Sequence, residues 1–237
     1  MIGTLHLIGV GPGDPELITL KAVRLLDDMP AVAFPATGTE SSALAYEIAR
    51  IHINPHAALL PIAMPIGVDR AAGQAAYDEA AKAILAHLLA GRDTAYLCEG
   101  DPLFYGSAMY LIGRIAPHAP VSIVPGVTSL TAAAAAIARP LAARNEVLKV
   151  LPAPLSDAVL RPELLATSAA AIIKVGRHFD RIRALLGETG HAGSAILIEH
   201  ATTERQRIFR LADVSHDDRS YFSMILCYRG KEVWGET

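Results

Sequence analysis

Residues 9–15 read Gly9-Val10-Gly11-Pro12-Gly13-Asp14-Pro15, and this glycine- and proline-rich segment decides the fold. Residues 4–10, which run into the start of this segment, predict a strand, and residues 15–26, which begin at its end, predict a helix. Asp14 is placed to accept from the free amides at the start of that helix, and Pro15 occupies the first helical position, where its missing N–H costs nothing. A strand, a glycine loop and a helix in this order are typical of an α/β protein.

The same alternation continues along the chain and predicts an α/β fold with a largely parallel sheet. Small and apolar residues recur at helical spacing between Asp69 and Leu89, and Gly91 offers a left-handed stop. The last two predicted strands have no clear helix between them, which indicates an antiparallel component. The predicted strands are 4–10, 31–34, 94–98, 121–124, 146–151, 170–175, 194–198, 206–211 and 221–228.

A length of 237 residues allows two modest domains, since domains usually run to roughly 100–200 residues. The segment Ala116-Pro117-His118-Ala119-Pro120 has two prolines and no periodicity, so we expect it to link the two halves. The expected domains are residues 1–118, an α/β domain, and residues 119–237, an α/β domain with a partly antiparallel sheet.

Composition excludes several classes of partner. A net charge of −3 offers no global field for nucleic acid, so no such partner is expected. Cys98 and Cys227 form no CxxC pair, which argues against a disulfide framework or a zinc site and favours a reducing cytoplasm. The start, Met1-Ile2-Gly3-Thr4, lacks a secretory pattern, and the small-residue stretch 130–138 is far shorter than a membrane span, so no membrane partner is expected.

A metal site and a serine hydrolase also lack support. His52 and His56 are separated by Asn54-Pro55, which breaks a helix that could align the two imidazoles. The chain contains no HExxH motif and no G-x-S-x-G elbow. We therefore expect no metal.

Two further glycine loops follow predicted strands. Glu99-Gly100-Asp101-Pro102 comes after strand 94–98, and Val124-Pro125-Gly126-Val127-Thr128-Ser129 follows strand 121–124. Ligands bind beyond the carboxyl ends of strands in open parallel sheets, so we expect the three loops to line one pocket. Asp101 is suited either to bind ribose hydroxyls or to cap a helix. Replacing Gly126 with arginine is expected to abolish cofactor binding and to leave the protein folded, because the side chain would project into that pocket.

The glycines of the first loop resemble a dinucleotide fingerprint only superficially. The third glycine comes too early, Pro12 removes an amide donor, and the second strand ends in Phe34-Pro35 where a ribose-binding acid is expected. A nucleotide-dependent oxidoreductase is therefore the weaker alternative. A third alternative is a non-catalytic sensor that binds the ligand of these loops without converting it.

Two later segments, residues 174–178 and 199–204, also follow predicted strands. In this order the five segments resemble the tetrapyrrole methylase family over essentially the whole chain. The resemblance implies two α/β domains with a cleft between them, S-adenosyl-L-methionine as methyl donor, a tetrapyrrole substrate and a homodimer. Glu99 before Gly100-Asp101, and Tyr221-Phe222-Ser223-Met224, resemble the branch that methylates carbon 20 of precorrin-2 in cobalamin biosynthesis. The nearest competitor in the family acts on the cobalt-containing form of the same ring.

The resemblance also implies which residues contact the donor, most of them through backbone or van der Waals contacts, with Ser223 added from the last strand. It implies no catalytic residue, because Pro35 stands where sirohaem-forming relatives carry an aspartate. A methyl sulfonium is already activated, so the protein mainly has to align the reactants and exclude water. The implied donor contacts are Pro12, Glu99, Gly100, Asp101, Phe104, Thr128, Ser129, Val175, Ala201 and Ser223.

The carboxylates of a tetrapyrrole call for basic residues. Arg139, Arg144, Lys174 and Arg177 lie near the predicted loops, and ordinary solvated charge is the alternative interpretation of each.

Overall fold

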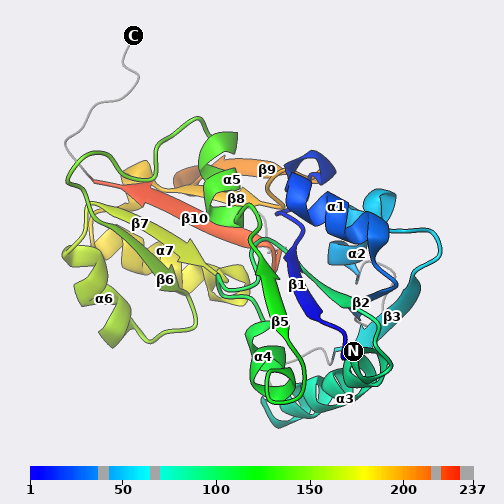
Figure 1. Ribbon diagram of the computed structural model, residues 1–237. Helices are drawn as coiled ribbons and strands as arrows, with labels where there is room; N and C mark the ends of the chain where they lie inside the picture. Colours follow the sequence, from blue (N-terminus) through cyan, green and yellow to red (C-terminus); the bar gives the residue numbers. More distant parts are fainter. Residues whose placement is uncertain (37–42, 65–69, 215–219, 230–237) are drawn as a thin grey trace. The chain divides into compact units, whose positions relative to one another are not determined.

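The computed structural model describes residues 1–36, 43–64, 70–214 and 220–229. The chain divides into two compact units, Met1–Thr128 and Ser129–Thr237, and each contains one five-stranded sheet with helices (Figure 1). The boundary differs from the expected one after His118. Strand 121–124 pairs in parallel with strand Leu5–Gly9 and so belongs to the first unit. The expected linker is a helix end, because the amides of Ala116 and His118 donate to carbonyls of residues 112 and 115.

The first unit is built on a fully parallel sheet of order β3-β2-β4-β1-β5. Helices α3 and α4 cover one face of the sheet, and α1 and α2 cover the other. The central strands β1 and β4 are therefore buried on both sides, which explains their nearly continuous apolar sequences. The strands are β1 (Leu5–Gly9), β2 (Ala31–Ala36), β3 (Ala58–Ala63), β4 (Thr94–Cys98) and β5 (Val121–Val124), and the helices are η1 (Pro15–Leu17), α1 (Leu20–Asp28), α2 (Leu44–Ala49), η2 (Arg50–His52), α3 (Arg70–Leu89) and α4 (Met109–Ile115).

The helix expected over residues 15–26 is two helices. Asp14 accepts from the Glu16 amide at 2.8 Å as expected, but the helix that it starts is a single 3-10 turn. Thr19 has extended backbone angles, and its hydroxyl accepts from the Ala22 amide at 3.2 Å. This second N-cap restarts the chain as α1.

Strand β3 was not predicted. It lies at the edge of the sheet and four of its six residues are exposed. Its sequence, ALLPIA, is an apolar run, but Pro61 within the run argues against a strand. Its neighbour β2 pairs with β3 up to Ala36 but with β4 only up to Ala33. Pro35, which has no N–H to donate, lies beyond the last β4 pair.

The second unit has a mixed sheet of order β6-β7-β10-β8-β9. Strand β10 runs antiparallel to both β7 and β8, so the expected antiparallel component is present, but β8 separates the last two strands of the chain. One face packs on α6 and α7, and α5 contacts β10. The strands are β6 (Leu148–Pro152), β7 (Ala169–Ile173), β8 (Ile196–Glu199), β9 (Arg207–Arg210) and β10 (Ser223–Tyr228), and the helices are α5 (Ser129–Ala136), α6 (Asp157–Leu165), η3 (Gly176–His178), α7 (Phe179–Glu188), η4 (Ala192–Ser194) and η5 (Leu211–Asp213).

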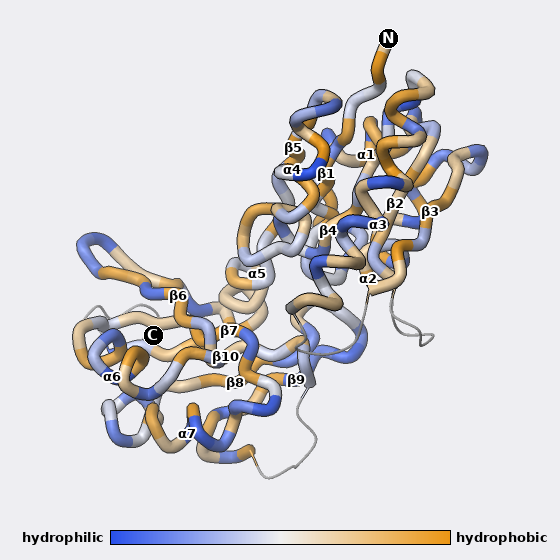
Figure 2. Tube along the Cα trace, turned by 90° about the horizontal axis from the view of Figure 1, so that it is seen from below, coloured by the Kyte–Doolittle hydropathy of each residue, from blue (hydrophilic) through white to orange (hydrophobic). Residues whose placement is uncertain are grey.

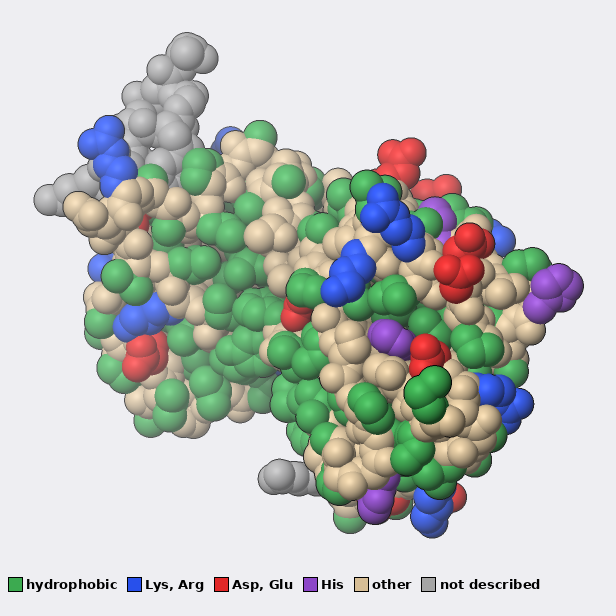
Figure 3. Space-filling model, in the orientation of Figure 1, with side chains coloured by type: hydrophobic (Ala, Val, Ile, Leu, Met, Phe, Trp, Pro, Cys, Tyr) green, Lys and Arg blue, Asp and Glu red, His purple; other side chains and the backbone are tan. Residues whose placement is uncertain are grey.

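The apolar residues follow the strands, as the hydropathy colouring of the two sheets in Figure 2 shows. On the face drawn in Figure 3, Lys and Arg side chains are scattered among acidic and apolar ones instead of forming one basic surface. Within the described ranges, no helix combines the length and apolarity needed to cross a bilayer. The same ranges hold no group of three or more His, Cys, Asp or Glu side chains placed to bind a metal ion.

Candidate functional site

Three loops meet at the carboxyl edge of the first sheet, because β4, β1 and β5 are neighbours there. Gly11 and Gly100 pair as an antiparallel bridge, with the Gly100 amide donating to the Gly11 carbonyl at 2.8 Å. Their φ angles are 87° and 64°, a region that glycine enters without strain. The first and second loops are therefore joined backbone to backbone.

The third loop packs equally closely against the other two. A Cβ atom added to Gly126 would lie 2.0 Å from the Gly100 carbonyl oxygen and 2.9 Å from the Gly9 Cα. A Cβ on Gly9 would lie 2.6 Å from the Gly126 nitrogen. A side chain at position 126 therefore meets backbone before it reaches a ligand, so this geometry does not favour the expectation that Gly126→Arg leaves the protein folded.

Asp101 ties the second loop to the third. Its Oδ1 accepts from the Leu103 amide at 2.9 Å, and its Oδ2 accepts from the Gly126 amide at 3.0 Å. Neither bond caps a long helix, so the carboxylate holds two loops in register instead. Each oxygen keeps a second lone pair that a bound ligand can use. Phe104 follows in the same turn, half-buried, with its ring edge-to-face with Tyr105 at 5.2 Å.

The residues at the end of β4 differ in chemistry. The Cys98 thiol is buried, and burial raises its pKa, which keeps it in the unreactive protonated form. The Glu99 side chain is exposed to solvent. Protein atoms around its carboxyl still desolvate the charged form, and this raises the pKa of the carboxyl. Pro12 and Thr128 are half-buried in the first and third loops.

A second set of loops lies at one edge of the second sheet. Because β10 is antiparallel to β7 and β8, its first residue meets the ends of both strands. Ser223 accepts from the Gly176 amide at 3.1 Å and donates to the Ser220 carbonyl at 2.7 Å. This edge holds Val175, which is buried, and Ala201, which is half-buried.

Backbone strain gathers at this edge. Lys174, His200 and Thr202 have φ angles of 58°, 49° and 69°, a left-handed conformation that residues with a side chain seldom adopt. Behind them Glu199 is fully buried; its Oε2 lies 2.8 Å from Arg207 Nη2, and its Oε1 accepts from the Ser220 amide at 3.3 Å. Such strain persists where the surrounding contacts over-determine the loop, and it is commonly found at functional sites.

The structure divides the predicted donor-contact residues between these two edges. The first edge holds Pro12, Glu99, Gly100, Asp101, Phe104 and Thr128; Ser129 begins α5; and the second edge holds Val175, Ala201 and Ser223. Sequence reasoning missed the role of Gly9, whose position directly before the loop gives no sign of its contact with Gly126, and that of Ser220, which lies in no motif.

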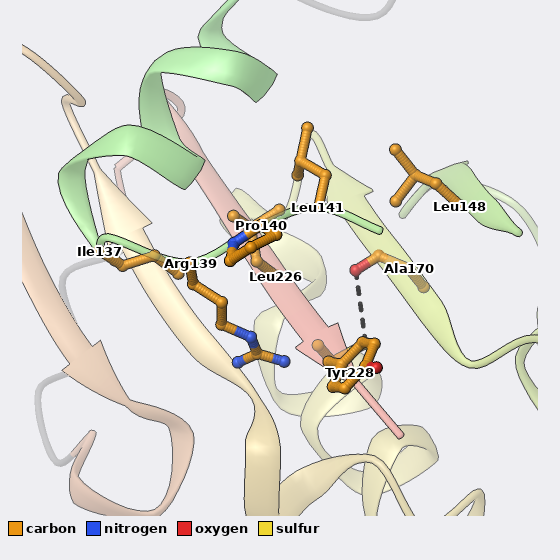
Figure 4. A pocket seen from close by; sticks show the side chains of 9 residues that line it. Ile137, Arg139, Pro140, Leu141, Leu148, Ala170, Leu226 and Tyr228 are labelled. Atoms are coloured by element: carbon orange, nitrogen blue, oxygen red, sulfur yellow. Dashed lines mark hydrogen bonds between the residues drawn. The ribbon is translucent and has the colours of Figure 1, made fainter. Parts of the chain in front are cut away.

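A separate pocket in the second unit lies beside β10 (Figure 4). Arg139 donates to the Ser194 carbonyl at 2.7 Å and its guanidinium carbon lies 5.4 Å from the centre of the Tyr228 ring. Burial lowers the pKa of Arg139, and it raises that of the Cys227 thiol to about 12. Arg139 is thus engaged by its own domain and is a poor candidate for substrate carboxylates. The lining residues are Ile137, Arg139, Pro140, Leu141, Leu148, Ala170, Leu226, Cys227 and Tyr228.

An open parallel sheet with three interlocked glycine loops at its carboxyl edge defines an α/β enzyme whose small ligand binds beyond the strand ends. A family model described as Tetrapyrrole (Corrin/Porphyrin) Methylases matches residues 4–214. The chain belongs to the tetrapyrrole methylase family, and by that membership it is a methyltransferase. The expected α/β fold is confirmed, and the oxidoreductase alternative is set aside.

Three curated relatives and one solved structure define the similarity further. The chain is 38% identical to the cobalamin biosynthesis protein CobIJ of Mycobacterium tuberculosis (strain ATCC 25618 / H37Rv), over 97% of this chain and 46% of that protein, so it spans about half of that relative. It is 36% identical to a precorrin-2 C(20)-methyltransferase of Sinorhizobium sp, over 95% of both chains. Identity to the cobalt-precorrin-2 C(20)-methyltransferase of Salmonella typhimurium is 32%, over 95% of this chain and 96% of the relative.

The structure of the cobalt precorrin-4 methyltransferase CbiF is similar to this one with a TM-score of 0.76 and 25% identity. The similarity covers 95% of this chain and 94% of the other.

Proposed function

We propose that the chain transfers a methyl group from S-adenosyl-L-methionine to carbon 20 of precorrin-2 in cobalamin biosynthesis. The observation that carries the proposal is the interlocking of the loops at residues 9–13, 99–104 and 125–128 at one sheet edge. Similarity over nearly the full length of a relative named for this reaction supports the substrate.

The residues at the first edge suit such a donor. Gly11 and Gly100 join the first two loops backbone to backbone, and the second lone pairs of Asp101 can accept from ribose hydroxyls. When bound, S-adenosylmethionine supplies an activated methyl group, so the chemistry calls for no metal and no covalent nucleophile. The two buried cysteine thiols, with their raised pKa values, accord with that chemistry.

The protein's part in the reaction is to fix geometry before the substrate arrives. The hydrogen bonds from the Gly126 and Leu103 amides to Asp101 hold the second loop in one position. Preformed loops avoid reorganisation during methyl transfer, and alignment of donor and acceptor lowers the entropic part of the barrier. We propose the same ten donor contacts that the sequence implies.

A second candidate substrate is cobalt-precorrin-2, because one relative is named for it at 32% identity. Parallel turnover assays with the metal-free and the cobalt-containing ring decide between the two. We expect faster turnover of the metal-free ring, and a higher kcat/KM for the cobalt form would reverse the assignment.

Titration calorimetry tests the cofactor. We expect S-adenosylhomocysteine to bind with a micromolar Kd, and NAD to show no heat of binding. The reverse pattern would refute the donor assignment.

We also propose that the enzyme is a cytoplasmic homodimer without a nucleic-acid or membrane partner. The net charge of −3 supports the lack of a nucleic-acid partner, the two buried, unpaired thiols support the cytoplasm, and the homodimer is what the family resemblance implies. Light scattering coupled to size-exclusion chromatography measures the oligomeric state, and a monomer of 25.1 kDa would contradict it.

A further inference from the structure

The three loops at the carboxyl edge of the first sheet carry two ionisable side chains. Residues 9–13, 99–104 and 125–128 contain Glu99 and Asp101 and no other acidic or basic residue. Both oxygens of Asp101 accept from backbone amides, and this carboxylate holds the second and third loops together. The Glu99 carboxyl, directly after β4, makes no hydrogen bond or ion pair with any residue that the structure describes. Its oxygens therefore remain available to a bound molecule.

The backbone on both sides of Glu99 is fixed. The Cys98 carbonyl accepts from the Val10 amide at 2.9 Å, and the Gly100 amide donates to the Gly11 carbonyl at 2.8 Å. The side chain between these two bonds is exposed to solvent, so it moves only about its own rotatable bonds. A reachable carboxyl on a fixed backbone, beside the loops proposed to hold the methyl donor, is well placed for proton transfer.

The surroundings of this carboxyl weaken its preference for the charged form. Desolvation by protein atoms raises the pKa of Glu99, and no cation among the described residues opposes that shift. The titratable groups near it are Asp101 in its own loop and, on β4, Tyr96 and Cys98, which are buried, have raised pKa values and stay neutral. A carboxylate whose pKa is raised towards the working pH is a better proton acceptor than an ordinary one.

The proposed reaction releases a proton that some group must accept. Carbon 20 carries a hydrogen, and its π electrons form the new C–CH3 bond as the S–CH3 bond breaks and S-adenosylhomocysteine leaves. The electrons of the C–H bond then return to the conjugated ring as the proton departs. We infer that the Glu99 carboxylate accepts this proton and is the general base of the methyl transfer. The inference rests on the proposed function and adds to it the residue that completes the reaction.

The proposed donor contact at Glu99 is compatible with this role. Most of the implied donor contacts are made by backbone or by van der Waals contact, and a backbone contact leaves the carboxyl free. After the reaction, the exposed side chain can pass its proton to water, which restores the carboxylate for the next turnover.

The test uses the full chain, S-adenosylmethionine, and precorrin-2 prepared anaerobically with either hydrogen or deuterium at carbon 20. Glu99→Gln keeps the size of the side chain but cannot accept the proton, so kcat should fall roughly 100-fold, within the usual range for general-base catalysis. The Kd of S-adenosylhomocysteine, measured by calorimetry, should stay unchanged, and it also reports that the variant is folded.

Two readouts separate proton transfer from a structural role. Loss of the base makes departure of the proton rate-limiting, so deuterium at carbon 20 should slow Glu99→Gln and leave the wild type nearly unaffected. The wild-type kcat should rise with pH through the raised pKa of Glu99, because only the carboxylate accepts a proton. That rise should be absent in Glu99→Gln.

Glu16→Gln is the matched control. Glu16 is also an exposed glutamate of the first unit, in the turn η1 that follows the first loop. The same substitution there should leave kcat, its pH dependence, the isotope effect and the Kd unchanged.

An unchanged kcat in Glu99→Gln would overturn the inference and leave the proposed function intact. A fall in kcat that accompanies an equally weakened Kd, without an isotope effect, would assign Glu99 to donor binding alone and would also overturn the inference. A wild-type chain that transfers no methyl group to precorrin-2 would instead contradict the proposed function itself.

Discussion

Replacing Gly126 with alanine should destabilise the first unit and weaken donor binding together. The added Cβ would lie 2.0 Å from the Gly100 carbonyl oxygen, so the third loop must move by about 1.4 Å to reach an ordinary contact distance of 3.4 Å. The obstructing atoms are backbone, and no rotamer change relieves them. Movement also lengthens the 3.0 Å hydrogen bond from the Gly126 amide to Asp101.

The clash and the lengthened hydrogen bond together set the expected loss in the free energy of unfolding. Overpacking against fixed atoms costs about 1–3 kcal/mol, and a hydrogen bond to a charged acceptor contributes about 1.5–3 kcal/mol when it is lost entirely. Because the bond is stretched and not removed, we expect a loss of about 3 kcal/mol in the free energy of unfolding. For a unit of this size that loss lowers the Tm of the first unit by roughly 10 °C.

Thermal unfolding followed by circular dichroism, together with calorimetry of S-adenosylhomocysteine, measures both consequences. Gly113→Ala in α4 serves as the control and should be neutral or slightly stabilising, because its Cβ has open space and alanine favours a helix. If Gly126→Ala unfolds and binds like the wild type, the loops are not interlocked as described.

Asp101→Asn should weaken the binding of S-adenosylhomocysteine and lower the free energy of unfolding by about 1 kcal/mol, because one of the two backbone amides loses its acceptor. Asp101→Ala should cost about twice as much, because both amides lose their acceptor. Equal stability of the two variants in urea unfolding would contradict this role. His191 is fully buried, and desolvation lowers the pKa of its imidazole, so its contribution to stability is present above its ordinary pKa of about 6.5 and is lost as the pH falls further. His191→Gln should flatten the fall in Tm between pH 7 and pH 5, whereas replacement of the exposed His56 should leave that fall unchanged. Tyr96 is 1% exposed, and its hydroxyl has no hydrogen-bond partner among the described residues. Tyr96→Phe should therefore raise the free energy of unfolding, measured in urea, by up to about 1 kcal/mol. A clear decrease in that free energy would reveal a partner for the hydroxyl.

The sequence predicts the central strands well because burial on both faces leaves a local signature. The central strand β4 has the predicted bounds, and so does the edge strand β5; Gly91 ends α3 with a φ of 79° as expected. Competing caps cannot be ranked from local chemistry alone, since Asp14 and Thr19 are both good N-caps and only the fold decides that α1 starts after the second.

The division after Thr128, ten residues beyond the expected boundary, depends on a contact between distant parts of the chain. Pro117 and Pro120 predict a break in the chain, and a break does occur after α4, but pairing of β5 with β1 is a long-range contact that no local pattern carries. The edge strand β3 is an apolar run, ALLPIA, without alternation, and Pro61 inside it is a residue that sheets tolerate only at edges or bulges, a position that depends on the sheet order.

The candidate site could be located from sequence but not interpreted fully. Glycines after strands predict where the loops lie, and their interlocking follows from the sheet order, which depends on tertiary contacts. The two possible roles of Asp101 could be separated only by its partners, Leu103 and Gly126.

The position of the transferred methyl group tests the central claim most directly. Purified protein is incubated anaerobically with precorrin-2 and S-adenosylmethionine that carries a 13C-labelled methyl group, and the product is analysed by mass spectrometry and 13C NMR. The proposed function predicts one added methyl group, with the label attached to carbon 20. Label on any other carbon, or no label in the ring, would contradict it.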